Sequence, residues 1–129
     1  MKNLELYLHI PFCRKKCSYC DFLSAPATDE VQQRYVMQMI QEIRTVSKLY
    51  ADYEVVTVFI GGGTPSILDA ALVNSLLEQL YHDFHILPDA EITMECNPGT
   101  LDAGRQRAYK TSGINRLSMG MQSADDREL

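Results

Sequence analysis

Residues 55–66 read VVTVFIGGGTPS, and they contain a strand, its end and the turn that follows it. The β-branched and aromatic run Val55–Ile60 predicts a buried strand that ends at the glycines of 61–63. Asp69 can then cap a helix whose apolar residues recur at helical spacing, namely Leu72, Val73, Leu76, Leu77 and Leu80. A strand followed by an amphipathic helix is the repeating unit of a parallel α/β sheet.

The same pattern continues on both sides of this stretch. The predicted strands are 4–10, 55–60, 91–96 and 115–121, and the predicted helices are 29–50, one from 69, one from 100 to 113, and one starting near 123. Four such units predict parallel strands joined by right-handed crossovers, which is an α/β fold. Because four units cannot close a barrel, we expect a truncated domain whose last strand has a free edge.

Composition narrows the function classes. The chain has 129 residues, 46% of them hydrophobic and 22% charged, which is typical of a folded globular domain. A net charge of -5 predicts no electrostatic affinity for nucleic acid or anionic membranes. No export signal or transmembrane run is visible, so we expect a cytoplasmic protein. In that reducing compartment, clustered cysteines indicate metal binding or catalysis rather than disulfides.

Unusual residues follow each predicted strand. They lie at 13–20, 61–66, 95–99 and 122–123. The carboxyl ends of parallel strands share one edge, and in barrels of parallel strands that edge carries the active site. We therefore expect the four clusters to form one site.

The first cluster contains Cys13, Cys17 and Cys20 in the spacing C-x3-C-x2-C. A 4Fe-4S cluster usually takes four thiolates, so three would leave one iron open to bind S-adenosylmethionine. A zinc site with His9 or Asp21 as fourth ligand is an alternative, since thiolates suit both metals. A redox pair formed by Cys17 and Cys20 is another, although it leaves Cys13 unexplained.

The other clusters suit a cofactor with amino and hydroxyl groups. The glycines of 61–63 could expose backbone carbonyls to an ammonium group, and no phosphate-loop pattern is present. Glu95 could accept hydrogen bonds from ribose hydroxyls, and Gln122 offers a neutral donor and acceptor. Cys96 should point to the opposite face of its strand, so we expect it to be a buried, inert thiol.

Four segments, YLHIPFCRKKCSYCDF, VFIGGGTPS, EITMECNPG and GINRLSMGMQS, together resemble the HemN/HemW branch of the radical S-adenosylmethionine superfamily. The resemblance implies a partial (β/α) TIM-like barrel in which residues 1–129 are the N-terminal part of the core domain, with its C-terminal half and the C-terminal domain absent. It also implies that Cys13, Cys17 and Cys20 bind the 4Fe-4S cluster. The residues that it places around S-adenosylmethionine are Tyr7, Tyr19, Gly62, Gly63, Thr64, Glu95 and Gln122.

One position separates the two kinds of protein in this branch. The coproporphyrinogen III oxidases typically carry another cysteine two residues after the third ligand, where this chain has Phe22. The resemblance therefore favours a heme chaperone over an oxidative decarboxylase of the porphyrin precursor. It implies heme or porphyrin, a heme-acceptor protein and an electron donor such as a flavodoxin or ferredoxin as partners. A zinc-stabilised βα protein is the remaining alternative.

Overall fold

The structure is a computed structural model, and it describes residues 1–13, 25–26, 29–62, 68–96 and 103–119. A sheet of four parallel strands has the order β1-β4-β5-β6. The strands are β1 (Lys2–Ile10), β4 (Tyr53–Gly62), β5 (His85–Cys96) and β6 (Arg116–Met119). The predicted parallel strands are confirmed within these residues, and β6 lies at one edge of the sheet.

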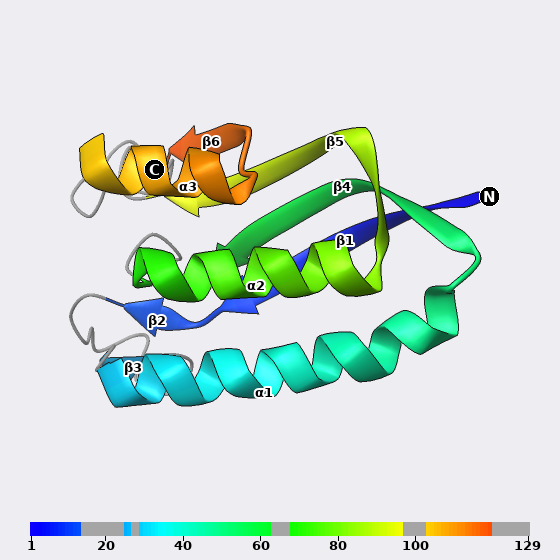
Figure 1. The fold of residues 1–129 in the computed structure, drawn as a ribbon. Helices are drawn as coiled ribbons and strands as arrows, with labels where there is room; N and C mark the ends of the chain where they lie inside the picture. Colours follow the sequence, from blue (N-terminus) through cyan, green and yellow to red (C-terminus); the bar gives the residue numbers. More distant parts are fainter. Residues whose placement is uncertain (14–24, 27–28, 63–67, 97–102, 120–129) are drawn as a thin grey trace, which may run out of the picture.

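The described helices cover one face of this sheet (Figure 1). They are α1 (Asp29–Ser47), which continues as the 3-10 turn η2 (Lys48–Tyr50), then α2 (Ala70–Asp83) and α3 (Ala103–Ser112). Strand order follows chain order and the helices share one face, which is the arrangement of a barrel rather than of a doubly wound sheet. The fold is therefore part of a (β/α) barrel.

The core lies between the helices and the sheet. Alternate strand residues point toward the helices and are buried, among them Leu8, Ile10, Val58, Ile60, Ile92 and Met94. From α2, the predicted apolar stripe supplies Val73, Leu76, Leu77 and Leu80, all buried. The residues between these strand positions face the opposite side of the sheet, which the described helices leave uncovered.

Polar contacts fix the start of α2 between its neighbours. Asp69 caps α2 as predicted, because its carboxylate accepts a hydrogen bond from the Ala71 N–H at 3.4 Å. From α1, Gln32 Oε1 accepts from the Asp69 N–H at 3.2 Å. From α3, the Arg105 guanidinium donates to the Leu68 carbonyl at 2.7 Å. Leu68 and Asp69 are thus hydrogen-bonded to α3 and α1, respectively.

Two differences from the sequence prediction concern segment boundaries. The segment from Cys13 to Pro26, predicted as a loop, begins and ends in short paired strands, β2 (Phe12–Cys13) and β3 (Ala25–Pro26). In addition, β5 starts at His85 rather than at Glu91, with a register irregularity opposite Val55 and Thr57. The predicted fourth helix and the end of the fourth strand lie outside the described residues. Among the described helices, none is long and apolar enough to cross a membrane.

Candidate functional site

The strands β1, β4, β5 and β6 are parallel, so their carboxyl ends meet at one edge. Of the predicted cofactor residues, the structure describes Tyr7, Gly62 and Glu95, together with the backbone of Cys13. The remaining predicted residues lie outside the described part of the chain; they are Cys17, Tyr19, Cys20, Gly63, Thr64 and Gln122.

Glu95 and Gly62 are in direct contact at this edge. The Gly62 N–H donates a hydrogen bond to Glu95 Oε1 at 3.1 Å, which joins the end of β4 to the end of β5. The Glu95 side chain is half-buried on the sheet face that the described helices leave uncovered. The glycine segment and the carboxylate are therefore adjacent at this edge, and their role in binding a cofactor stays a prediction.

The backbone of Gly61 is approached by three side chains. A Cβ atom added to Gly61 would lie 2.7 Å from Phe59 Cε1, 3.1 Å from Glu95 Oε1 and 3.1 Å from Tyr7 Cε1. The distance to Phe59 Cε1 is shorter than real Cβ contacts, so a side chain at position 61 would force the surrounding side chains to move. Tyr7, Phe59 and Glu95 therefore converge on bare backbone.

At position 62, glycine is required by the backbone conformation and by a close contact with β1. Its φ of 127° lies in a region that L-residues with side chains rarely adopt. An added Cβ would lie 2.5 Å from the carbonyl oxygen of Ile10. The end of β4 thus packs directly on the backbone of β1, three residues before Cys13.

His9, named above as an alternative zinc ligand, lies next to Tyr7 and Tyr35. The Tyr7 hydroxyl lies 3.2 Å from His9 Nδ1, and the Tyr35 hydroxyl of α1 donates to the His9 carbonyl at 2.6 Å. Burial raises the pKa of Tyr35, with smaller contributions from the charge of Glu42 and from Tyr7. Two-residue alternation from Tyr7 could have placed His9 on the same face, whereas no local signal connects Tyr35 to it.

Cys96 points away from the site, as predicted. It is 2% exposed, and its thiol lies 3.6 Å from the Met94 carbonyl. Burial, followed by the nearby charge of Glu95, raises its thiol pKa to about 11. At neutral pH this thiol stays protonated, and a protonated buried thiol is a poor metal ligand.

The pairing of β2 with β3 concerns the cysteine cluster. Phe12 pairs with Ala25 and Cys13 with Pro26, so the two ends of the segment that contains Cys17 and Cys20 are adjacent. Within the described residues, His, Cys, Asp and Glu side chains form no group of three that could hold a metal ion. The assignment of the three cysteines as cluster ligands remains a prediction.

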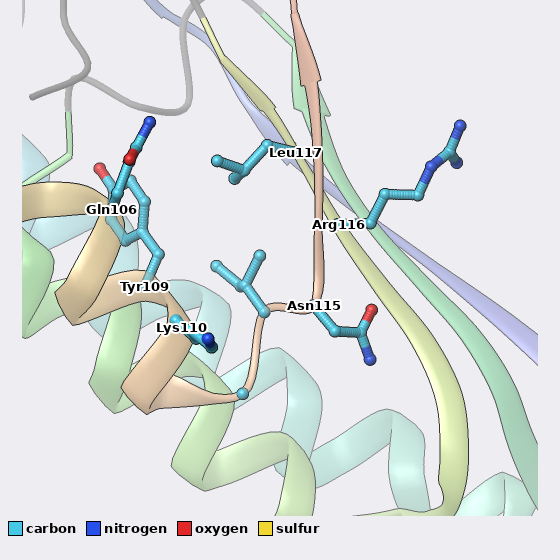
Figure 2. A pocket seen from close by; sticks show the side chains of 8 residues that line it. Gln106, Tyr109, Lys110, Asn115, Arg116 and Leu117 are labelled. Carbon is cyan, nitrogen blue, oxygen red and sulfur yellow. The ribbon is translucent and has the colours of Figure 1, made fainter. Parts of the chain in front are cut away.

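A hollow of about 540 Å³ lies between α3 and β6 (Figure 2). Tyr109, Ile114 and Leu117 line it on the helix-covered side of the sheet. Of the predicted cofactor residues that the structure describes, Tyr7, Gly62 and Glu95 are not among its lining residues.

Comparison with known proteins agrees with this arrangement. The model of the Radical SAM superfamily matches residues 7–129. The heme chaperone HemW of Escherichia coli is 42% identical over 127 residues, which are 98% of this chain. The oxygen-independent coproporphyrinogen III oxidase of Salmonella typhimurium is 38% identical over 122 residues, or 94% of this chain.

A solved structure shows the same fold. The coproporphyrinogen III oxidase HemN from Escherichia coli, described as a radical SAM enzyme, aligns with a TM-score of 0.84 and 34% identity over 93% of this chain. The chain therefore belongs to the radical S-adenosylmethionine superfamily. Within that superfamily, its relatives place it in the HemN/HemW branch.

The matched relatives are longer than this chain. It spans 34% of the Escherichia coli heme chaperone, 27% of the Salmonella oxidase and 28% of the solved oxidase structure. The part that they share with this chain contains the strands β1, β4, β5 and β6 and the edge at which Glu95 meets Gly62.

Proposed function

We propose that this chain is the N-terminal part of the core domain of a HemW-like heme chaperone, which binds a 4Fe-4S cluster and S-adenosylmethionine and transfers heme to acceptor proteins. The observation that carries the proposal is the contact between Glu95 and Gly62 at the carboxyl edge, in a chain of this family. In the proposed site, Cys13, Cys17 and Cys20 hold the cluster. The S-adenosylmethionine residues are Tyr7, Tyr19, Gly62, Gly63, Thr64, Glu95 and Gln122.

The described residues fit a nucleoside-bearing ligand. Glu95 carries two carboxylate oxygens, of which Oε1 already accepts from the Gly62 N–H, and a carboxylate has capacity for further hydroxyl donors. The absence of a side chain at Gly61 lets Tyr7 and Glu95 approach the same stretch of backbone, so that both lie at this edge. When bound, the reduced cluster supplies one electron for cleavage of a carbon–sulfur bond of S-adenosylmethionine. The chain's own residues orient the ligand and fix its ribose.

Phe22 supports the chaperone over the oxidase, because the oxidases typically have a cysteine at this position. Heme, an acceptor protein and an electron donor such as a flavodoxin or ferredoxin are the partners of this function. We place it in the cytoplasm, where a reducing environment keeps the cysteine thiols available for a cluster. Full activity belongs to a protein of the length of the relatives.

The second candidate function is that of an oxygen-independent coproporphyrinogen III oxidase. Similarity to the Salmonella oxidase and to the solved oxidase structure favours it. The two functions make different demands on the same protein. A chaperone must bind heme and release it to an acceptor, whereas the oxidase must convert coproporphyrinogen III to protoporphyrinogen IX by oxidative decarboxylation.

The first experiment tests the metal centre. The protein is reconstituted with iron and sulfide without oxygen, and iron, sulfide and zinc are measured. We expect four irons per chain (the 4Fe-4S stoichiometry) in the unaltered protein, and loss of the cluster in Cys13→Ala, Cys17→Ala and Cys20→Ala. Cys96→Ala is the matched control, because this thiol is buried on the opposite face. Loss of iron from Cys96→Ala, or colourless protein with stoichiometric zinc, would refute the ligand assignment.

The second experiment separates the two functions. Heme binding is followed by absorbance and its transfer by loading of an apo-acceptor, while conversion of coproporphyrinogen III is followed by product analysis with a reductant and S-adenosylmethionine. We expect heme binding and transfer without turnover of coproporphyrinogen III. Turnover of that substrate would assign the oxidase function instead.

A further inference from the structure

A row of side-chain positions crosses all four main strands on the uncovered face of the sheet. The strand register places Tyr7 beside Phe59, Phe59 beside Thr93, and Thr93 beside Arg116. Glu95 lies two residues after Thr93 on β5, so this row begins at Tyr7, itself one of the proposed S-adenosylmethionine residues, and runs beside Glu95. A ligand on this row would lie next to that cofactor.

One end of the row is aromatic. The Tyr7 and Phe59 ring centroids are 5.9 Å apart with only 14° between the ring planes. Tyr7 is 59% exposed, so its ring is open to a ligand. The two rings are stacked against each other, and such an aromatic pair can accept a further aromatic ligand in a stacked or edge-to-face arrangement.

The other end of the row is cationic. Arg116 is one of the residues that line the hollow beside α3, but its side chain lies on the other side of β6 from that of Leu117 (Figure 2). Its guanidinium lies 3.4 Å from Glu91 Oε1, and the two side chains are 58% and 53% exposed. An ion pair this long and exposed contributes little, so a carboxylate of a ligand can replace Glu91 at low cost.

The spacing of these groups fits one ligand class. Adjacent strands lie about 4.8 Å apart, so the row extends about 14 Å from the first strand to the fourth. We propose that Arg116 binds a propionate carboxylate of the tetrapyrrole, while the macrocycle packs against the aromatic pair of Tyr7 and Phe59. This inference rests on the proposed function and names the part of the site that recognises its ligand.

Heme and heme dimethyl ester are the probes, because esterification removes the carboxylate charges and keeps the macrocycle. Each is titrated into the protein in the same detergent, and binding is followed by absorbance. Arg116→Met should weaken heme binding about tenfold, since a charge-assisted bond is lost, and should leave the ester unchanged. Glu91→Gln should strengthen heme binding about two- to threefold, because a competing carboxylate is removed. Arg107→Met is the matched control, since Arg107 is exposed on α3.

If Arg116 recognises the propionate, heme affinity falls in Arg116→Met and rises in Glu91→Gln. If the ion pair is only structural, heme affinity falls in both variants. Equal effects of Arg116→Met on heme and its ester, or weaker heme binding in Glu91→Gln, would overturn the inference. Those results would leave the proposed function standing if the unaltered protein binds heme. Absence of heme binding by an unaltered protein of the relatives' length would refute the proposed function itself and this inference with it.

Discussion

Replacement of Gly62 by alanine is the most direct probe of how the site edge is packed. The change adds one methyl group at a residue whose φ is 127°, and a non-glycine residue in such a region costs about 1–3 kcal/mol. The new Cβ would lie 2.5 Å from the Ile10 carbonyl oxygen, about 0.9 Å short of the ordinary 3.4 Å contact. Backbone, not a flexible side chain, must move to relieve this clash. We expect a total loss of about 3–4 kcal/mol in the free energy of unfolding.

Gly113→Ala is the matched control for this experiment. Gly113 has a similar φ of 117°, but an added Cβ would meet the Tyr81 hydroxyl at 3.0 Å. Tyr81 is 48% exposed and can move aside, so we expect a loss of only about 1–2 kcal/mol. The difference between the two variants isolates the contact of β4 with β1.

Urea unfolding followed by circular dichroism measures both variants. With a slope of about 2 kcal/mol per M, Gly62→Ala should lower the midpoint by roughly 1.5–2 M and Gly113→Ala by less than about 1 M. Losses that agree within about 0.5 kcal/mol would show that Gly62 does not pack on the Ile10 backbone, and the geometry of the site edge would have to be revised.

Three further predictions concern the neighbouring strands. Glu95→Gln should retain the hydrogen bond from the Gly62 N–H and change the unfolding free energy by less than about 0.5 kcal/mol. It should weaken S-adenosylmethionine binding about tenfold in a calorimetric titration. An unchanged affinity would show that Glu95 does not contact this ligand. Folding raises the thiol pKa of Cys96 to about 11, so the unfolding free energy should fall as pH rises from 9 through 11, by at most about 3 kcal/mol. If the stability of Cys96→Ala falls equally steeply over that pH interval, this thiol is not the cause. Asn115→Ala removes two 2.9 Å hydrogen bonds, from the Ile92 N–H and to the Ala90 carbonyl, so unfolding free energy should fall by about 1–3 kcal/mol. Asn3→Ala, at an exposed position near the chain start, should differ from the unaltered protein by no more than about 0.5 kcal/mol.

The strands and helices could be predicted because their apolar residues form clear patterns. The strand β4 contains a continuous run of β-branched and aromatic residues, and the buried residues of α2 recur at helical spacing. The early start of β5 could not be predicted, because Pro88 and Asp89 are strand breakers in the sequence. The structure accommodates them at an irregularity, where His85 and Ile86 pair with β4 before the register resumes at Glu91.

The site was predictable where it depended on strand ends alone. Because the carboxyl ends of parallel strands meet at one edge, Glu95 was expected to lie near Gly62, and the structure shows their contact. The roles of Phe59 and Tyr35 were missed for different reasons. Phe59 reads as a core residue within an apolar run, although the alternation of β4 points it to the uncovered face. Tyr35 reaches the His9 carbonyl from α1 through tertiary packing, which no local pattern encodes.

The most direct measurement is the EPR spectrum of the reduced, anaerobically reconstituted protein with and without S-adenosylmethionine. We expect a spectrum typical of a reduced 4Fe-4S cluster whose g-values shift when the cofactor is added, because it would bind the one iron that carries no cysteine. In Glu95→Gln the same shift should require about tenfold more cofactor. A cluster spectrum that S-adenosylmethionine leaves unchanged at saturating concentration would contradict the assignment of this sheet edge as its binding site.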